Sequence, residues 1–124
     1  MGKYRFVKPE VARLDLSDGD WIDVKRYLTY GEQQRITGSS IGKMRMDQAN
    51  PEVGVDWEKF SVVRLSTWIV DWSFVDESDK RVRVTSDAIR ELHPDTIEEI
   101  DKVLTSHIEA LEELKKVPRS KTEP

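Results

Sequence analysis

The stretch DWEKFSVVRLSTWIVDWSF, residues 56–74, decides how this 124-residue chain must fold. Its large apolar side chains are Trp57, Phe60, Val63, Leu65, Trp68, Ile69 and Trp72. On a helical wheel these positions cover more than half of the circumference, so a helix here must be covered on two sides. Asp56 is suited to be its N-cap. We therefore predict a central helix over residues 56–74, with a strand as the alternative for the second half, where β-branched residues are frequent.

A β-hairpin is predicted upstream, near residues 12–26. One run of alternating apolar and polar residues ends at Leu16, and a run rich in β-forming residues begins at Trp21. Between them lies the sequence Ser-Asp-Gly-Asp, in which Gly19 can take the positive φ that a tight turn needs.

The first ten residues are expected to form an irregular arm. Lys3, Arg5 and Lys8 stand there against a single acid, Glu10. A frayed terminus is the simpler interpretation, and a docking tail is the alternative.

A helix is predicted after the hairpin. Thr29 and Glu32 have the spacing of a capping box, in which each side chain accepts a backbone N–H of the other residue. The helix should reach Ile41, although each of the two glycines in this part of the chain costs a helix about 1 kcal/mol relative to alanine. Residues 42–55 are expected to be a linker or loop.

Three short elements are predicted downstream of the central stretch. Residues 76–80 have the composition of a polar turn, and the alternating residues 81–84 predict a short third strand. Ser86 is expected to cap a short helix that ends at His93, because a proline disfavours helical backbone at the residue before it.

The last helix has the clearest pattern in the chain. A capping box with Asp95 and Glu98 opens it. Its apolar residues follow the three- and four-residue spacing of an amphipathic helix. They are Ile97, Ile100, Leu104, Ile108, Leu111 and Leu114. Acids near its start and Lys115 and Lys116 near its end suit the helix dipole.

Together these elements predict a helix-rich α+β fold, an N-terminal β-hairpin packed on three to four helices. We expect an irregular N-terminal arm over residues 1–10, a single globular domain over 11–117 and a disordered tail over 118–124. One domain of this size is typical of chains of about 100–150 residues.

The composition narrows the class of protein. Hydrophobic residues make up 37% of the chain and charged residues 35%, with four Trp, three Tyr and three Phe for a core. The absence of Cys removes disulfides, thiolate nucleophiles and Cys-based metal sites. No apolar run is long enough to span a bilayer, and the first residues lack a signal-peptide core. The net charge of −4 gives no general attraction to nucleic acid. Taken together, these observations predict an intracellular protein with no nucleic-acid or membrane partner.

No pattern in the sequence supports catalysis. The residues three positions before His93 and His107 are Arg90 and Leu104, neither of which can bind a metal as the Glu of a di-iron motif does. Residues 38–43 lack the spacer and the Ser or Thr of a phosphate-binding loop. The many acids of the last helix are explained by a solvated face. We therefore predict no enzyme, no catalytic residue, no metal site and no cofactor.

The tryptophans of the central stretch are the candidate binding residues. Trp57, Trp68 and Trp72 are 11 and 4 residues apart, so a continuous helix places them near one face. A structural core is the simpler interpretation, and an anchor for a partner helix is the alternative. Arg64 would share a stripe with Trp68 and Asp71, where a cation–π contact or an ion pair would satisfy it. The candidate partner-binding residues are thus Trp57, Arg64, Trp68 and Trp72.

Four phrases of the sequence, in this order, resemble a known family. They are LSDGDWIDVK, LTYGEQQR, LSTWIVDWSF and IRELHPDT, and an acidic terminal helix follows them. Over residues 13–114 the chain resembles the small tail assembly chaperone-type proteins of long-tailed bacteriophages. The resemblance concerns the order of elements and these phrases, and it includes no catalytic residue.

The resemblance implies a non-enzymatic chaperone in the host cytoplasm. Such a protein coats the long helical tape-measure protein, keeps it soluble until tail-tube subunits polymerise around it, and self-associates along it. The implied partners are the tape-measure protein and, as a further candidate, the tail-tube protein. The first alternative is a structural tail or head–tail connector component retained in the virion. A small hydrolase and a host regulatory adaptor are further alternatives.

Overall fold

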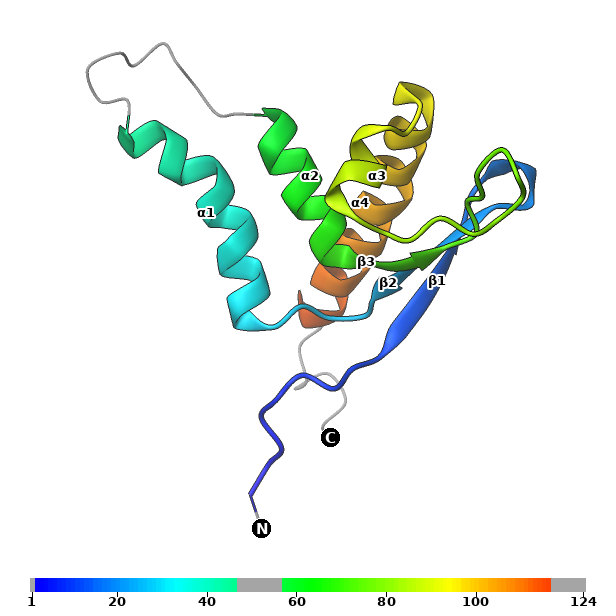
Figure 1. The fold of residues 1–124 in the computed structure, drawn as a ribbon. Coiled ribbons are helices and arrows are strands. Elements are labelled where there is room, and N and C mark those ends of the chain that lie inside the picture. The colour runs from blue at the N-terminus through cyan, green and yellow to red at the C-terminus, as the bar shows by residue number, and fades with distance from the viewer. Residues whose placement is uncertain (1, 47–56, 117–124) are drawn as a thin grey trace.

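The computed structural model describes residues 2–46 and 57–116, and the side chains of residues 2–39 and 57–114. It has a three-stranded antiparallel sheet in the order β1-β2-β3 and four α-helices, so the predicted helix-rich α+β fold is confirmed. The helices gather on one side of the sheet, and α1 runs alongside α2 (Figure 1). Within the described residues, no helix is both long enough and apolar enough to cross a membrane.

The predicted hairpin is confirmed. Strands β1 (Val11–Asp15) and β2 (Trp21–Lys25) pair over their whole length and are joined by the 3-10 turn η1 (Ser17–Gly19). Gly19 takes a φ of 80°, and Asp18 before it a φ of 59°. The alternation of the sequence sets the two faces: Ile22 and Val24 are fully buried against the helices, while their neighbours on β2 face outward.

The predicted central helix is correct only in its first half. Helix α2 (Trp57–Trp68) runs directly into strand β3 (Ile69–Trp72), which pairs with the open edge of β2. The helical prediction for residues 69–74 is therefore wrong, and the strand alternative is correct. In the last turn of α2 the hydroxyls of Ser66 and Thr67 both donate to the carbonyl of Val63. Beyond them a β-branched sequence finds hydrogen-bond partners on β2.

The third strand was expected at residues 81–84, and that prediction is wrong. Residues 81 and 82 lie against the chain that follows β3, through an antiparallel bridge between Val75 and Arg81 and a hydrogen bond from the backbone N–H of Val82 to the carbonyl of Phe74 at 3.0 Å. This pairing does not continue into a strand over 81–84. Opposite Asp23 and Val24 of β2, strand β3 has a bulge at Val70, which has no partner on β2 and is 47% exposed.

Helix α1 (Tyr30–Met46) begins with the predicted capping box. The backbone N–H of Glu32 donates to Thr29 Oγ1 at 3.1 Å, and the backbone N–H of Thr29 donates to Glu32 Oε1 at 2.8 Å. The helix extends past Ile41 into the segment expected to be a linker. The rest of that segment, residues 47–55, lies outside the described residues.

Both helix starts in the second half differ from prediction by one or two residues. Helix α3 (Ser86–Arg90) is capped by Thr85 rather than Ser86, since Thr85 Oγ1 accepts from the backbone N–H of Ala88 at 3.0 Å. It also ends before His93. Helix α4 (Pro94–Lys116) is capped by His93 rather than Asp95. Proline suits the first helical position because that residue needs no N–H partner.

The core lies between the sheet and the helices. Its fully or nearly buried side chains are Ile22, Val24, Leu28, Val62, Leu65, Trp68, Ile69, Trp72, Ile89, Ile100 and Leu104. The predicted apolar stripe of α4 supplies Ile100 and Leu104, both 0% exposed. Leu114, at the far end of that stripe, is exposed. The stripe therefore meets the core through its middle.

Candidate functional site

Two of the four candidate binding residues are buried in the core. Trp68 is 6% exposed, and its ring meets the ring of His107 edge to face at 5.7 Å between centroids. Trp72 is 1% exposed, and its Nε1–H donates to the carbonyl of Val82 at 2.7 Å. The expected common face does not exist, because the helix ends at Trp68 and Trp72 belongs to a strand. Neither ring is accessible to a partner.

Trp57 remains on the surface at the first position of α2. Its side chain is 70% exposed, and its ring packs edge to face on Phe60 with centroids 6.0 Å apart. This arrangement holds a large apolar group in a fixed orientation while leaving most of it in water. An exposed, oriented tryptophan is the kind of residue that dominates binding energies at protein interfaces.

Arg64, the second surface candidate, has a different partner from the one expected. Its Nη1 donates to Asp101 Oδ1 at 2.8 Å and its Nη2 to Thr105 Oγ1 at 3.3 Å, so it joins α2 to α4. The predicted stripe with Trp68 and Asp71 is therefore wrong. Asp71 lies on β3 and pairs instead with Arg81 at 3.3 Å.

Trp57 and Arg64 border the same hollow. It has a volume of about 430 Å³ and is lined by Trp57, Phe60, Ser61, Arg64, Asp101 and Thr105. We call it the Trp57 hollow. Two aromatic rings form its apolar side, and the paired guanidinium and carboxylate form its polar side. An apolar centre beside satisfied polar groups is the usual anatomy of a protein-binding surface.

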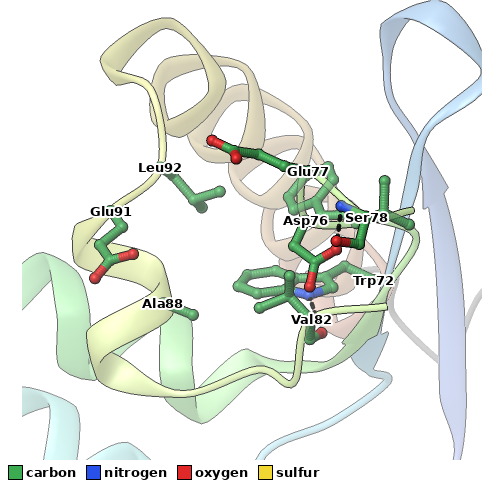
Figure 2. Close-up of a pocket in the computed structure, with 10 residues that line it drawn as sticks. Trp72, Asp76, Glu77, Ser78, Val82, Ala88, Glu91 and Leu92 are labelled. Atoms are coloured by element: carbon green, nitrogen blue, oxygen red, sulfur yellow. Dashed lines mark hydrogen bonds between the residues drawn. The ribbon is translucent and has the colours of Figure 1, made fainter. Parts of the chain in front are cut away.

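A second, larger hollow lies between α3 and the loop that follows β3 (Figure 2). It has a volume of about 730 Å³. Phe74, Val82, Ala88 and Leu92 form its apolar floor above the buried Trp72, and Asp76, Glu77 and Glu91 stand at its rim. We call it the acidic hollow, because three of the ten described residues that line it are acidic and none is basic. No sequence pattern predicts it, since its residues come from segments with no common motif.

The wall of the acidic hollow is held in one conformation. Asp76 Oδ1 accepts from the backbone N–H groups of Ser78 at 2.8 Å and Lys80 at 3.1 Å. The backbone N–H of Asp76 donates to the carbonyl of Lys80 at 2.8 Å, and Asp79 closes the turn with a φ of 62°. Figure 2 shows the Trp72 indole at the base of this wall, with its N–H on Val82. These hydrogen bonds fix the turn of residues 76–80 that forms this wall.

The outward face of the sheet is covered by its own charged side chains. Arg13 lies over the ring of Trp21, with Cζ 3.6 Å from the centroid, and its Nε and Nη2 donate to Asp23 at 2.8 and 3.1 Å. The hydrogen bonds to Asp23 raise the pKa of Arg13 above its usual value. Arg81 approaches the same ring at 5.3 Å. The charged groups on this face therefore find their contacts within the chain and do not require a partner protein.

Two carboxylates make contacts that the sequence did not reveal, Glu99 with Ser17 and Glu32 with Lys25. Glu99 of α4 accepts from the backbone N–H and the hydroxyl of Ser17, at 2.6 and 3.0 Å, and so fixes the hairpin turn. Burial raises the pKa of Glu32, but the ion pair with Lys25 and the hydrogen bonds with Thr29 outweigh it, and the net pKa is lowered.

The described residues contain no group of three or more His, Asp or Glu side chains placed to hold a metal ion. His107 is half-buried against Trp68, with Nε2 3.3 Å from the carbonyl of Lys25. Comparison with protein-family models, with curated proteins and with solved structures finds no match to this chain.

Proposed function

We propose that this protein is a non-enzymatic tail assembly chaperone of a long-tailed bacteriophage. In the host cytoplasm it would cover the apolar surface of the helical tape-measure protein until tail-tube subunits polymerise around that rod. The sequence phrases that resemble such chaperones motivate the proposal. The structural observation that supports it best is the exposed Trp57 at the edge of the Trp57 hollow.

The physical task of such a chaperone is to shield apolar side chains that project from a long amphipathic helix. The Trp57 hollow offers a cavity of about 430 Å³ beside an exposed indole, which suits the insertion of an aliphatic side chain. Tryptophan and arginine are the residues enriched where such side chains bind most strongly. The ion pair of Arg64 with Asp101 leaves no unpaired charge in the hollow for the partner to bury.

The size of the expected contribution follows from the exposure of Trp57. Tryptophan buries about 150–250 Å² at most, so a side chain that is 70% exposed has about 100–175 Å² left to bury in a complex. At about 25 cal/mol per Å² this amounts to about 2.5–4 kcal/mol. A loss of at least about 2 kcal/mol on truncation corresponds to about a 30-fold weaker Kd.

The experiment compares two exposed aromatic residues, each at the first position of a helix. The chain is co-expressed with the longest coiled-coil protein encoded near its gene, and binding is measured by pull-down and by titration. Trp57→Ala should weaken binding about 30-fold or more, while Tyr30→Ala, whose side chain is 77% exposed on α1, should leave it within about threefold. Equal effects of the two variants would contradict the assignment of the Trp57 hollow.

A second measurement separates this function from its main alternative. A chaperone leaves the assembly, so purified virions should contain no stoichiometric amount of the chain. Detection of the chain at stoichiometric levels in virions by quantitative mass spectrometry would favour the structural tail or head–tail connector component.

A further inference from the structure

The acidic hollow is distinct from the Trp57 hollow and is not needed for the function proposed above. Its floor is apolar and its rim has three carboxylates. Asp76 is engaged in its own turn, which leaves Glu77 and Glu91 exposed at the opening. An apolar floor beside carboxylates suits a ligand that carries both apolar and basic side chains.

The N-terminal arm of this same chain has that chemistry. Tyr4 and Phe6 are 62% and 78% exposed, and their rings touch each other at 5.8 Å between centroids. Lys3 and Arg5 alternate with these rings, and Lys8 lies over Tyr4 at 5.8 Å. Alternate residues of an extended segment point to opposite sides, so the arm can present rings on one side and cations on the other.

The base of the arm is fixed to the domain, which determines its direction. The backbone N–H of Arg26 donates to the carbonyl of Glu10 at 2.8 Å, and the side chains of these two residues pair at 3.8 Å. The single acid of the arm is thus already paired. Val7, Lys8 and Pro9 still line a pocket together with Tyr27 and Val70, and the part of the arm before them extends away from the domain (Figure 1).

The arm and the acidic hollow lie at opposite ends of the sheet. The arm continues from Val11, which pairs with Lys25 at one end of the hairpin. The hollow follows β3 at the other end, where the backbone N–H of Ser73 donates to the carbonyl of Trp21. An arm that points away from its own hollow is placed to reach the hollow of another copy.

We infer that the arm of one copy of this chain docks in the acidic hollow of a second copy. Phe6 and Tyr4 contact the floor formed by Phe74 and Leu92, while Lys3 and Arg5 pair with Glu77 and Glu91. Because the two surfaces differ and lie at opposite ends, the contact is head-to-tail, and it builds rings or open chains according to the rotation between successive copies. The charge pairs at the rim make the association weaken as the salt concentration rises.

The test uses charge reversal on each side in the full chain, followed by light scattering after size exclusion over a range of protein concentrations. The unmodified chain should associate with increasing concentration. Lys3→Glu with Arg5→Glu, and separately Glu77→Lys with Glu91→Lys, should each raise the concentration for half-association by about tenfold or more, because like charges then meet. All four residues are exposed, so unchanged circular dichroism and Tm are expected for both variants.

A mixture of the two variants provides the decisive measurement. The acidic arm of the first then fits the basic hollow of the second, and the reverse pairing retains the original charges. Association should return to at least the level of the unmodified chain. A chain that stays monomeric at all concentrations, an association that ignores the reversals, or a mixture that stays dissociated would overturn the inference.

A third readout separates self-association from another occupant. A photocrosslinker at position 6 should join isotopically distinct copies, with the crosslink in residues 74–92. Crosslinks confined to one copy would overturn the inference in favour of an intramolecular contact. If Glu77→Lys with Glu91→Lys loses binding to the coiled-coil partner while self-association is unchanged, the occupant of the acidic hollow is that partner, and the inference is overturned. The Trp57→Ala result stands apart from both, because that residue belongs to the other hollow.

Discussion

Replacing Trp68 with alanine tests whether the junction between α2 and β3 is the structural centre of the molecule. The side chain is 6% exposed, so nearly all of its area of about 150–250 Å² is buried. At about 25 cal/mol per Å² the lost burial is about 3.5–6 kcal/mol, in line with the about 3–5 kcal/mol typical of Trp→Ala in a core. The variant also loses the edge-to-face contact with His107, 5.7 Å away.

The assay is urea unfolding and thermal unfolding, each followed by circular dichroism, with Trp57→Ala as the matched control. For a chain of this size a loss of 3–5 kcal/mol corresponds to a fall in Tm of about 10–20 °C. Trp57→Ala should change the free energy of unfolding by no more than about 0.5 kcal/mol, since the residue is 70% exposed. If Trp68→Ala fails to fold, Trp68→Phe serves as a milder variant with a smaller loss. Equal losses for positions 57 and 68, or a loss below about 1 kcal/mol for Trp68→Ala, would refute the account of the core.

Three further predictions concern single contacts. Glu32 has a lowered pKa, so its contribution to stability is present above the ordinary value of 4.5 and is lost as pH falls through the lower pKa of the folded state. In urea unfolding, the difference in stability between the unmodified chain and Glu32→Gln should therefore shrink as the pH falls. Glu99→Gln and Ser17→Ala should each cost about 1 kcal/mol, and a double-mutant cycle in urea should show coupling of about 0.5–1.5 kcal/mol; additive losses would mean that the hairpin turn does not depend on this contact. Thr85→Ala should lower the stability by about 1 kcal/mol, because it removes a helix cap, whereas Ser86→Ala should change it by no more than about 0.5 kcal/mol. Both values are measured by thermal unfolding, and the reverse order would place the cap at Ser86.

The parts of the fold that the sequence predicts correctly are those with local causes. The hairpin depends on alternation and on Gly19, the start of α1 on the reciprocal bonds of Thr29 and Glu32, and α4 on a long, regular stripe. In each case the residues that decide the structure are a few positions apart. Periodicity and capping chemistry are therefore sufficient.

The incorrect predictions concern residues whose conformation or contacts depend on a segment far away in the sequence. An apolar run such as residues 56–74 fits a buried helix as well as a helix followed by a buried strand. The open edge of β2, more than 40 positions upstream, selects the strand. Likewise the α2–α4 contact of Arg64 joins residues 37 positions apart, and the contact of Glu99 with Ser17 spans 82. No local pattern contains that information.

The candidate site was predictable only in part. Residue type predicts Trp57 and Arg64 as candidate binding residues, and in the structure both line one hollow. Trp68 and Trp72 have the same residue type and similar neighbours, yet they lie in the core because the helix ends between them. The acidic hollow depends on two segments meeting across the fold, which residue type alone does not predict.

The proposed function is tested most directly by the solubility of the tape-measure rod. The rod is expressed alone and together with this chain, and the soluble fraction is examined by size exclusion with light scattering. The account predicts an insoluble rod in the first case and, in the second, a soluble complex with many copies of the chain per rod. A rod that stays insoluble in the presence of the chain, with no complex between them, would contradict it.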